Sequence, residues 1–162
     1  MSKVILICGK ICCGKTTYAQ KLCKENNAIL LSVDEITLAL FGRDAGENHD
    51  TYVERAEKYL FEKSIELIES GINVVLDWGF WTKTERDFAK EFYRLHKIDY
   101  EIHYIEISDE IWNARLKKRN SAIVAEETTA YYVDDGLAQK FASIFEMPNA
   151  DEIDVVYQGD IE

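Results

Sequence analysis

Gly9-Lys10-Ile11-Cys12-Cys13-Gly14-Lys15-Thr16 fits the pattern G-x-x-x-x-G-K-[ST] of a phosphate-binding P-loop. The apolar run Val4-Ile5-Leu6-Ile7 before it is typical of a buried parallel strand, and residues 17–22 after it have helical composition. A strand before the loop and a helix after it are the context that separates a P-loop from an accidental glycine-rich turn. This stretch therefore predicts an α/β fold that binds a nucleoside triphosphate between its first strand and first helix.

The chemistry expected of this loop follows from its geometry. Two glycines let the chain curl so that backbone N–H groups point at a phosphate chain, and the helix N-terminus adds partial positive charge. Lys15 supplies a full charge near the β- and γ-phosphates, and Thr16 offers a hydroxyl to Mg²⁺. We therefore expect ATP and Mg²⁺ as cofactors. The predicted cofactor-binding residues of the loop are Gly9, Lys10, Ile11, Cys12, Cys13, Gly14, Lys15, Thr16 and Thr17.

Composition narrows the class of protein. The chain has 162 residues, of which 47% are hydrophobic and 30% charged, so we expect one globular domain over residues 1–162. No apolar run approaches the length of a bilayer span, and the first residues lead straight into the first predicted strand, which predicts a cytoplasmic protein without a membrane partner. The formal net charge of −11 argues against broad nucleic-acid binding, because such binding depends on neutralising phosphates.

The four cysteines, Cys8, Cys12, Cys13 and Cys23, all lie in or near the P-loop. Adjacent cysteines are a poor disulfide pair, and a metal cluster would compete with the phosphate for the same loop, so small buried residues are the favoured interpretation. A redox-sensitive thiol beside the nucleotide is the alternative for Cys12 and Cys13.

The rest of the chain alternates apolar runs with amphipathic stretches. The apolar runs predict strands over residues 4–7, 28–32, 73–77, 101–107 and 154–157. Helices are predicted near residues 35–41, from about 50 to 70, and over 83–96, 109–119 and 134–145. Strands separated by helices imply right-handed crossovers and a parallel sheet with both faces covered. The predicted fold is a three-layer α/β sandwich with a five-stranded parallel sheet.

Two aspartates follow predicted strands, at the edge of the sheet where ligands bind in such folds. Asp34 either accepts a proton from an attacking hydroxyl or caps the following helix. Asp77 ends the run 74–76 and resembles a Walker B carboxylate, which holds Mg²⁺ through water, although a capping role is again the alternative. Thr16 and Asp77 are therefore the predicted metal ligands.

Trp78, Phe80 and Trp81 form a dense aromatic group after Asp77, in what the sequence predicts to be a loop. Aromatic side chains are more often core residues than ligand platforms. Stacking of Trp78 and Trp81 on a substrate is the functional alternative.

Arg115 and Arg119 lie four residues apart, so both project from one face of a predicted helix. Together with residues 120–128, they suit a lid over about residues 115–130 that closes over ATP. One arginine would stabilise charge on the transferring phosphoryl group, and the other would bind phosphates or stack on adenine. The alternative is a surface helix whose arginines pair with the abundant carboxylates.

Taken together, these positions resemble the small P-loop kinases (AAA_33-like) grouped around the 5′-hydroxyl kinase domain of polynucleotide kinase, near gluconate kinases, chloramphenicol phosphotransferase and zeta-type toxins. The resemblance covers almost the whole chain and implies a P-loop kinase sandwich with a helical lid. The residues that carry it are 9–17, Asp34, 71–77, Glu85-Arg86, Arg115, Arg119, 145–148 and Glu152.

The resemblance implies transfer of the ATP γ-phosphate to an alcohol. By this likeness Asp34 is the general base, and Lys15 and Thr16 hold phosphate and magnesium. Arg119 is then the lid arginine that acts on the β- and γ-phosphates, and Arg115 binds the nucleotide. The polynucleotide-kinase branch places an arginine three residues after its base, where this chain has Thr37.

These observations favour an ATP:alcohol phosphotransferase with a small-molecule acceptor. The acceptor is expected among Asp34, Arg43, Trp78, Trp81 and Arg86. One alternative is a nucleoside monophosphate or nucleic-acid end as acceptor, although the absent arginine and the acidity of the chain argue against it. The other is a nucleotide-binding switch that transfers no phosphate to an acceptor.

Overall fold

The computed structural model describes residues 1–42, 46–124 and 135–159. Its strands are β1 (Lys3–Cys8), β2 (Ala28–Leu31), β3 (Asn73–Gly79), β4 (Asp99–Glu106) and β5 (Val155–Gln158). Its α-helices are α1 (Lys15–Asn26), α2 (Val33–Phe41), α3 (His49–Glu69), α4 (Lys83–Leu95), α5 (Asp109–Val124) and α6 (Asp135–Ile144). Short 3₁₀ helices, η1 (Gly46–Asn48) and η2 (Ala150–Glu152), precede α3 and β5.

The five strands form one parallel sheet in the order β2-β3-β1-β4-β5. In this sheet Val4 of β1 lies between Val74 of β3 and Tyr100 of β4. The prediction of a five-stranded parallel α/β sandwich is confirmed. β3 is longer than predicted and includes Trp78 and Gly79, so Trp78 is a strand residue rather than part of a loop.

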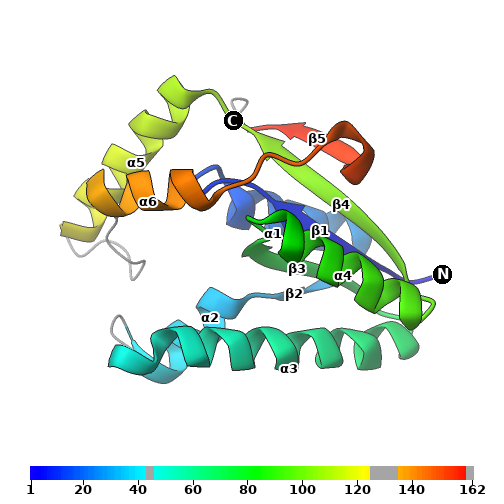
Figure 1. Cartoon of the computed structure of the whole chain (residues 1–162). Coiled ribbons are helices and arrows are strands. Elements are labelled where there is room, and N and C mark those ends of the chain that lie inside the picture. Colours follow the sequence, from blue (N-terminus) through cyan, green and yellow to red (C-terminus); the bar gives the residue numbers. More distant parts are fainter. Residues whose placement is uncertain (43–45, 125–134, 160–162) are drawn as a thin grey trace.

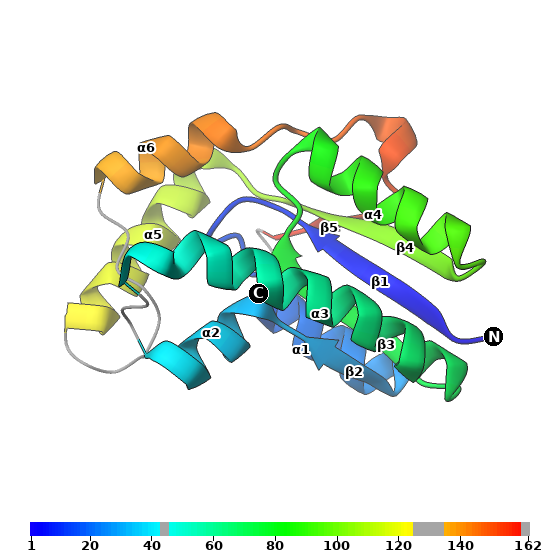
Figure 2. The ribbon, with the colours of Figure 1, turned by 60° about the horizontal axis from the view of Figure 1, so that its bottom comes forward.

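Helices cover both faces of the sheet, as Figures 1 and 2 show. α1 packs on one face, where Tyr18 and Leu22 contact Ile5 and Ile7. α3 and α4 cover the other face, and there Phe61 and Tyr93 belong to the larger core cluster. Because both faces are buried, the central strands are continuous apolar runs instead of alternating ones.

α5 and α6 lie beyond the carboxyl end of the sheet, beside the P-loop (Figure 1). Trp112 and Leu116 of α5 pack with Ala138 of α6 against Ile11 and Cys12 of the loop. α5 is one turn longer than predicted, and residues 125–130 of the predicted lid lie outside the described residues. Within the described part of the chain, no helix has both the length and the apolar character needed to cross a membrane.

Candidate functional site

The P-loop connects β1 to α1 with two residues in the left-handed region, Cys12 at φ 60° and Gly14 at φ 101°. Gly14 is the N-cap of α1, so the loop leads directly into a helix N-terminus. A Cβ atom at Gly9 would lie 2.7 Å from the sulfur of Cys13, which explains the need for glycine there. This is the backbone arrangement expected of a phosphate-binding loop.

Three side chains from two other parts of the chain, the turn after β3 and helix α5, donate hydrogen bonds to carbonyl groups of this loop. Trp81 Nε1 donates to the carbonyl oxygen of Gly9 at 3.1 Å, and Trp112 Nε1 donates to that of Ile11 at 2.6 Å. Arg115 Nη1 donates to the carbonyl of Cys13 at 3.0 Å. The loop conformation therefore depends on residues far from it in sequence, and Trp112 is one that the sequence did not single out.

The side chain of Lys15 folds back over the loop. Its Nζ donates to the carbonyl oxygens of Gly9 at 3.2 Å and Lys10 at 2.6 Å. The ammonium group is thus held beside the loop, where a phosphate chain cradled by the backbone would meet it.

Thr16 and Asp77 come together as the sequence predicts for a magnesium site. Thr16 Oγ1 donates to Asp77 Oδ2 at 2.9 Å, and Asp77 is buried at the end of β3. Burial raises the pKa of Asp77, while the charge of Lys15 and the hydrogen bond from Thr16 act in the opposite direction. The described residues contain no group of three or more His, Cys, Asp or Glu side chains that would hold a metal alone. Two protein oxygens at this place fit a hard cation that takes its other ligands from phosphates and water.

A cavity of about 970 Å³ lies beside the loop. From the P-loop, α1, α5 and α6 it is lined by Ile11, Cys12, Gly14, Lys15, Thr16, Thr17, Arg115, Arg119, Leu137, Lys140 and Phe141. From α2, α3, β3, the turn after β3 and the start of α4 it is lined by Val33, Asp34, His49, Asp50, Val53, Glu57, Asp77, Trp78, Trp81 and Glu85.

Asp34 lies in the first turn of α2, where it is exposed and lines the cavity. The N-cap of α2 is Ser32, whose side chain accepts a hydrogen bond from the backbone N–H of Glu35. Asp34 is therefore not the residue that caps α2, and its carboxylate is available to a ligand in the cavity.

Arg115 and Arg119 both project from α5 toward the P-loop and line the cavity. Besides its bond to Cys13, Arg115 donates through Nη2 to the carbonyl of Gly159. Arg119 Nη1 lies 3.2 Å from the sulfur of Cys12. The predicted common face of the two arginines is therefore turned to the loop rather than to solvent.

Trp78 and Trp81 line the cavity and also belong to aromatic packing. The ring of Trp78 meets that of Phe61 edge-on at 5.3 Å, and Trp81 packs against Phe141 of α6 at 4.9 Å. These tryptophans therefore belong to aromatic packing and also line the cavity, while their stacking on a substrate stays a prediction. Arg43, predicted beside them, lies outside the described residues.

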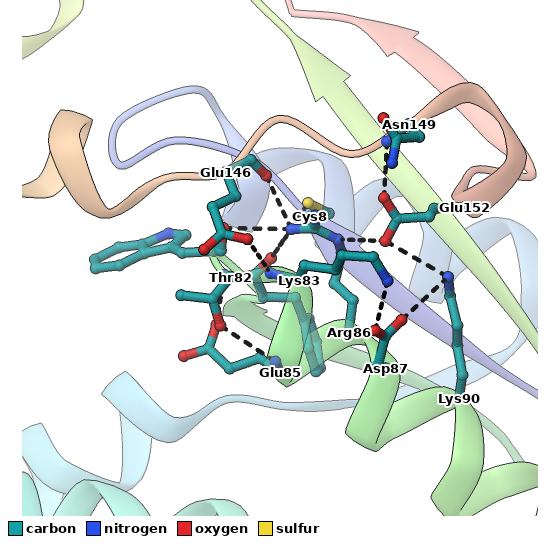
Figure 3. Close-up of polar contacts among 12 residues, drawn as sticks. Cys8, Thr82, Lys83, Glu85, Arg86, Asp87, Lys90, Glu146, Asn149 and Glu152 are labelled. Carbon is teal, nitrogen blue, oxygen red and sulfur yellow. Dashed lines mark hydrogen bonds and ion pairs between the residues drawn. The ribbon is translucent and has the colours of Figure 1, made fainter.

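Arg86, predicted to contact the acceptor, is not among the cavity-lining residues. Its side chain is 1% exposed and pairs with the buried carboxylate of Glu152, Nε to Oε1, at 3.2 Å (Figure 3). Nη1 donates to the carbonyls of Phe80, Trp81 and Glu146. Arg86 therefore ties the turn after β3 to the segment before β5. The sequence could not reveal this, because Glu146 and Glu152 lie 60 and 66 residues further along the chain.

We expect Arg86→Ala to destabilise the protein by about 3–5 kcal/mol, because it leaves the buried carboxylate of Glu152 with the more distant Lys90 as its ion-pair partner. Urea denaturation measures this free energy of unfolding. Arg94→Ala is the matched control, since Arg94 pairs with Glu91 on the exposed side of the same helix, and it is expected to change stability little. Equal effects of the two substitutions on the free energy of unfolding would show that the buried Arg86–Glu152 pair does not stabilise the fold.

The acidic residues of α3 and α4 in the cavity were not predicted. Asp50, Val53 and Glu57 share one face of α3, and Glu85 belongs to the capping box that begins α4. Helical periodicity alone would group the α3 residues on one face, but the sequence does not say which face meets the site.

Glu57 is unusual among these carboxyl groups. Burial raises its pKa to about 7, and the neighbouring charges of Glu85 and Glu54 act in the same direction. At pH values between 4.5, the ordinary pKa of a glutamate, and about 7, Glu57 therefore stays protonated in the native state but is ionised in the unfolded chain. It follows that stability falls as the pH rises through this interval and stays lower above it.

We expect Glu57→Gln to be more stable than the wild type at pH 8, by about 1 kcal/mol once its partial exposure is allowed for, and equally stable near pH 4.5. Thermal unfolding across this pH range measures the difference. Glu62→Gln, on the exposed side of the same helix, is expected to follow the wild type at every pH. A glutamine variant with no advantage at pH 8 would contradict the raised pKa.

The four cysteines are free. Cys8 and Cys13 are buried, and burial raises the pKa of both thiols, to about 12 for Cys8. These two therefore behave as small core residues. A redox role for the half-buried Cys12 stays a prediction.

Solved structures share this architecture. A sugar kinase from Janibacter sp. HTCC2649 superposes with a TM-score of 0.69 at 16% identity, covering 100% of this chain and 88% of that one. The Mycobacterium tuberculosis APS kinase CysC, in complex with AMPPNP and APS, gives 0.69 at 16%, covering 99% and 90%. A chain of the Pnkp1/Rnl/Hen1 RNA repair complex gives 0.69 at 21%, covering 88% and 43%. At these identities the likeness shows the fold alone.

No curated protein matches the chain. The model of one protein family, AAA_33, described as an AAA domain, matches residues 4–151. That match spans the P-loop, Asp34 of α2, Asp77 of β3, both arginines of α5 and the described cavity-lining residues. The resemblance to small P-loop kinases is thereby confirmed at the level of family and fold, and the chain belongs to the AAA_33 family.

Proposed function

We propose that the protein is an ATP-dependent phosphotransferase that moves the γ-phosphate to a hydroxyl group of a small molecule. The observation that carries this proposal is the composition of one cavity. It joins a P-loop lysine and threonine, a buried aspartate, two arginines and a second, exposed aspartate. A nucleotide-binding site alone does not need the last of these.

The nucleotide half of the reaction is assigned to the P-loop and α5. The loop and Lys15 bind the phosphate chain, and Thr16 with Asp77 would hold Mg²⁺, which neutralises charge on the β- and γ-phosphates when bound. Arg119 is positioned beside the loop to stabilise charge on the transferring group, and Arg115 fixes the loop by its bond to Cys13.

The acceptor half is assigned to Asp34 and the tryptophans. The acceptor oxygen attacks the γ-phosphorus, a new O–P bond forms, and the bond from the γ-phosphorus to the bridging oxygen of ADP breaks. Asp34 takes the proton of the hydroxyl group. Trp78 and Trp81 would position the acceptor beside it.

A nucleic-acid end is the less favoured acceptor. At the position three residues after Asp34, Thr37 is buried and its hydroxyl donates to the carbonyl of Val33 at 3.1 Å. Thr37 is therefore a core residue that cannot bind a phosphate of the acceptor. The net charge of −11 also opposes a polyanionic partner.

An ATP-consumption screen over sugars, nucleosides, amino alcohols, phenicol antibiotics and 5′-hydroxyl oligonucleotides tests the proposal. We expect one small-molecule class to stimulate ATP consumption by the wild type and not by Asp34→Asn. Stimulation only by oligonucleotides would replace the small-molecule acceptor. Steady ATP hydrolysis that no acceptor affects would favour the nucleotide switch.

A further inference from the structure

Apart from Asp77, which accepts a hydrogen bond from Thr16, the charged side chains that line the cavity belong to two walls. The basic side chains are Lys15 at the start of α1, Arg115 and Arg119 on α5, and Lys140 on α6. Opposite them, α2, α3 and α4 contribute Asp34, Asp50, Glu57 and Glu85, which we call the acidic wall. Figures 1 and 2 show α5 and α6 on one side of the P-loop and α2 with the first turns of α3 on the other.

The proposed nucleotide complements the charge of only one of these walls, the basic one. A triphosphate chain is a polyanion, and the P-loop with its neighbouring arginines complements it. The acidic wall has no such counterpart. Among the described residues that line it, His49 is the one that can carry positive charge, and only when it is protonated. The unmatched charge thus lies where the acceptor would bind.

Two tryptophans, Trp78 and Trp81, also line the cavity. Trp78 is held edge-on by Phe61, and Trp81 is held by Phe141 and by its bond to Gly9. Rings fixed in this way can receive a ligand without being ordered first. Aromatic rings beside carboxylates are the surroundings that ammonium groups favour, through cation–π attraction and charge pairing.

The position of Glu57 agrees with a cation-binding role for the acidic wall. It is half-buried, with Glu54 beside it on α3 and Glu85 close by on α4. Burial and these neighbouring carboxyl groups make the ionisation of Glu57 unfavourable, which is why its pKa is raised. A bound cation would relieve the repulsion.

We propose that the acceptor is an amine-bearing alcohol, whose ammonium group binds between the acidic wall and the tryptophans while its hydroxyl lies at Asp34. This inference rests on the proposed function and names its substrate class. The proposed acceptor site is part of the cavity beside the P-loop, and the negative charge of the acidic wall favours a positively charged acceptor. An acceptor that already carries a phosphate would be repelled.

Matched pairs of ligands test this proposal, with binding measured by calorimetry on the whole chain in the presence of MgADP. The pairs are glucosamine with glucose, ethanolamine with ethylene glycol, and 2-deoxystreptamine with myo-inositol. We expect at least one amine to bind about 10-fold or more tightly than its neutral partner, the scale of one charge pair in a partly buried site.

Two variants test whether the acidic wall causes the expected preference for amines over neutral alcohols. At pH 8, above the raised pKa of Glu57, Glu57→Gln and Asp50→Asn are each expected to reduce the preference to about 3-fold or less, since each removes one charge from the acidic wall. Glu62→Gln removes an exposed charge from the same helix without touching the cavity, and it is expected to leave the preference unchanged.

Equal binding of amines and their neutral partners would overturn the inference, and so would the absence of saturable binding by every amine. ATP consumption, measured on the same protein and ligands with MgATP in place of MgADP, separates this failure from that of the proposed function. Phosphate transfer to neutral alcohols alone would support the proposed phosphotransferase activity and contradict the proposal that the acceptor carries an amine. Selective amine binding without any transfer would reject the phosphotransferase and, with it, the acceptor role of the amine.

Discussion

Lys15→Ala is expected to lower kcat/KM for ATP by at least about 10³-fold. Loss of a preorganised donor to the transferring group typically lowers kcat by about 10²–10³-fold, and ATP affinity falls as well because a charge-assisted contact is lost. The fold is expected to survive, since the hydrogen bonds of Lys15 in this structure are confined to carbonyls of its own loop.

Steady-state kinetics and thermal unfolding together measure this expectation. Lys24→Ala, at the exposed last turn of the same helix, is the control and is expected to behave as the wild type. Near-normal turnover of the Lys15 variant would contradict the assignment of the P-loop as the nucleotide site.

Asp34→Asn is expected to lower kcat by about 10²–10⁴-fold, the usual contribution of a general base, while ATP affinity stays close to that of the wild type. The physical reason is that the amide keeps the size and polarity of the side chain but cannot accept the proton. Asp34 also comes from α2, whereas the basic side chains expected to bind the phosphates come from α1 and α5.

ATP binding by calorimetry and turnover with a saturating acceptor separate the two effects. Glu35→Gln alters the next residue along α2, which is exposed and does not line the cavity, so it serves as the matched control. A parallel loss of ATP affinity in the Asp34 variant would place this carboxylate on the metal instead.

The fold could be predicted because its determinants are local. A glycine-rich loop between an apolar strand and a helix, followed by alternating elements, leaves few topologies other than a parallel sheet. The end of β3 was missed because tryptophan and glycine after a polar aspartate are as typical of a loop as of a strand. Trp78 continues the strand here because its ring packs against Phe61 on the covered face.

The site could be predicted only where residues lie near the carboxyl end of a strand or share a short spacing. Asp34, Asp77 and the two arginines of α5 met one of these conditions, and all four line the cavity. Arg86 shows the limit, because its burial depends on Glu146 and Glu152, which only the folded chain brings near. The acidic residues of α3 were missed because the sequence does not fix the face that α3 turns to the cavity.

Phosphorus NMR of ATP incubated with the wild-type protein, Mg²⁺ and a mixture of hydroxyl acceptors that includes the amine-bearing alcohols tests the central claim most directly. The account predicts a new phosphomonoester resonance that grows with ADP and is absent with Asp34→Asn. Inorganic phosphate as the sole new product, formed at the same rate with and without acceptors, would contradict it and show that the cavity hydrolyses a nucleotide without transferring its phosphate to an alcohol.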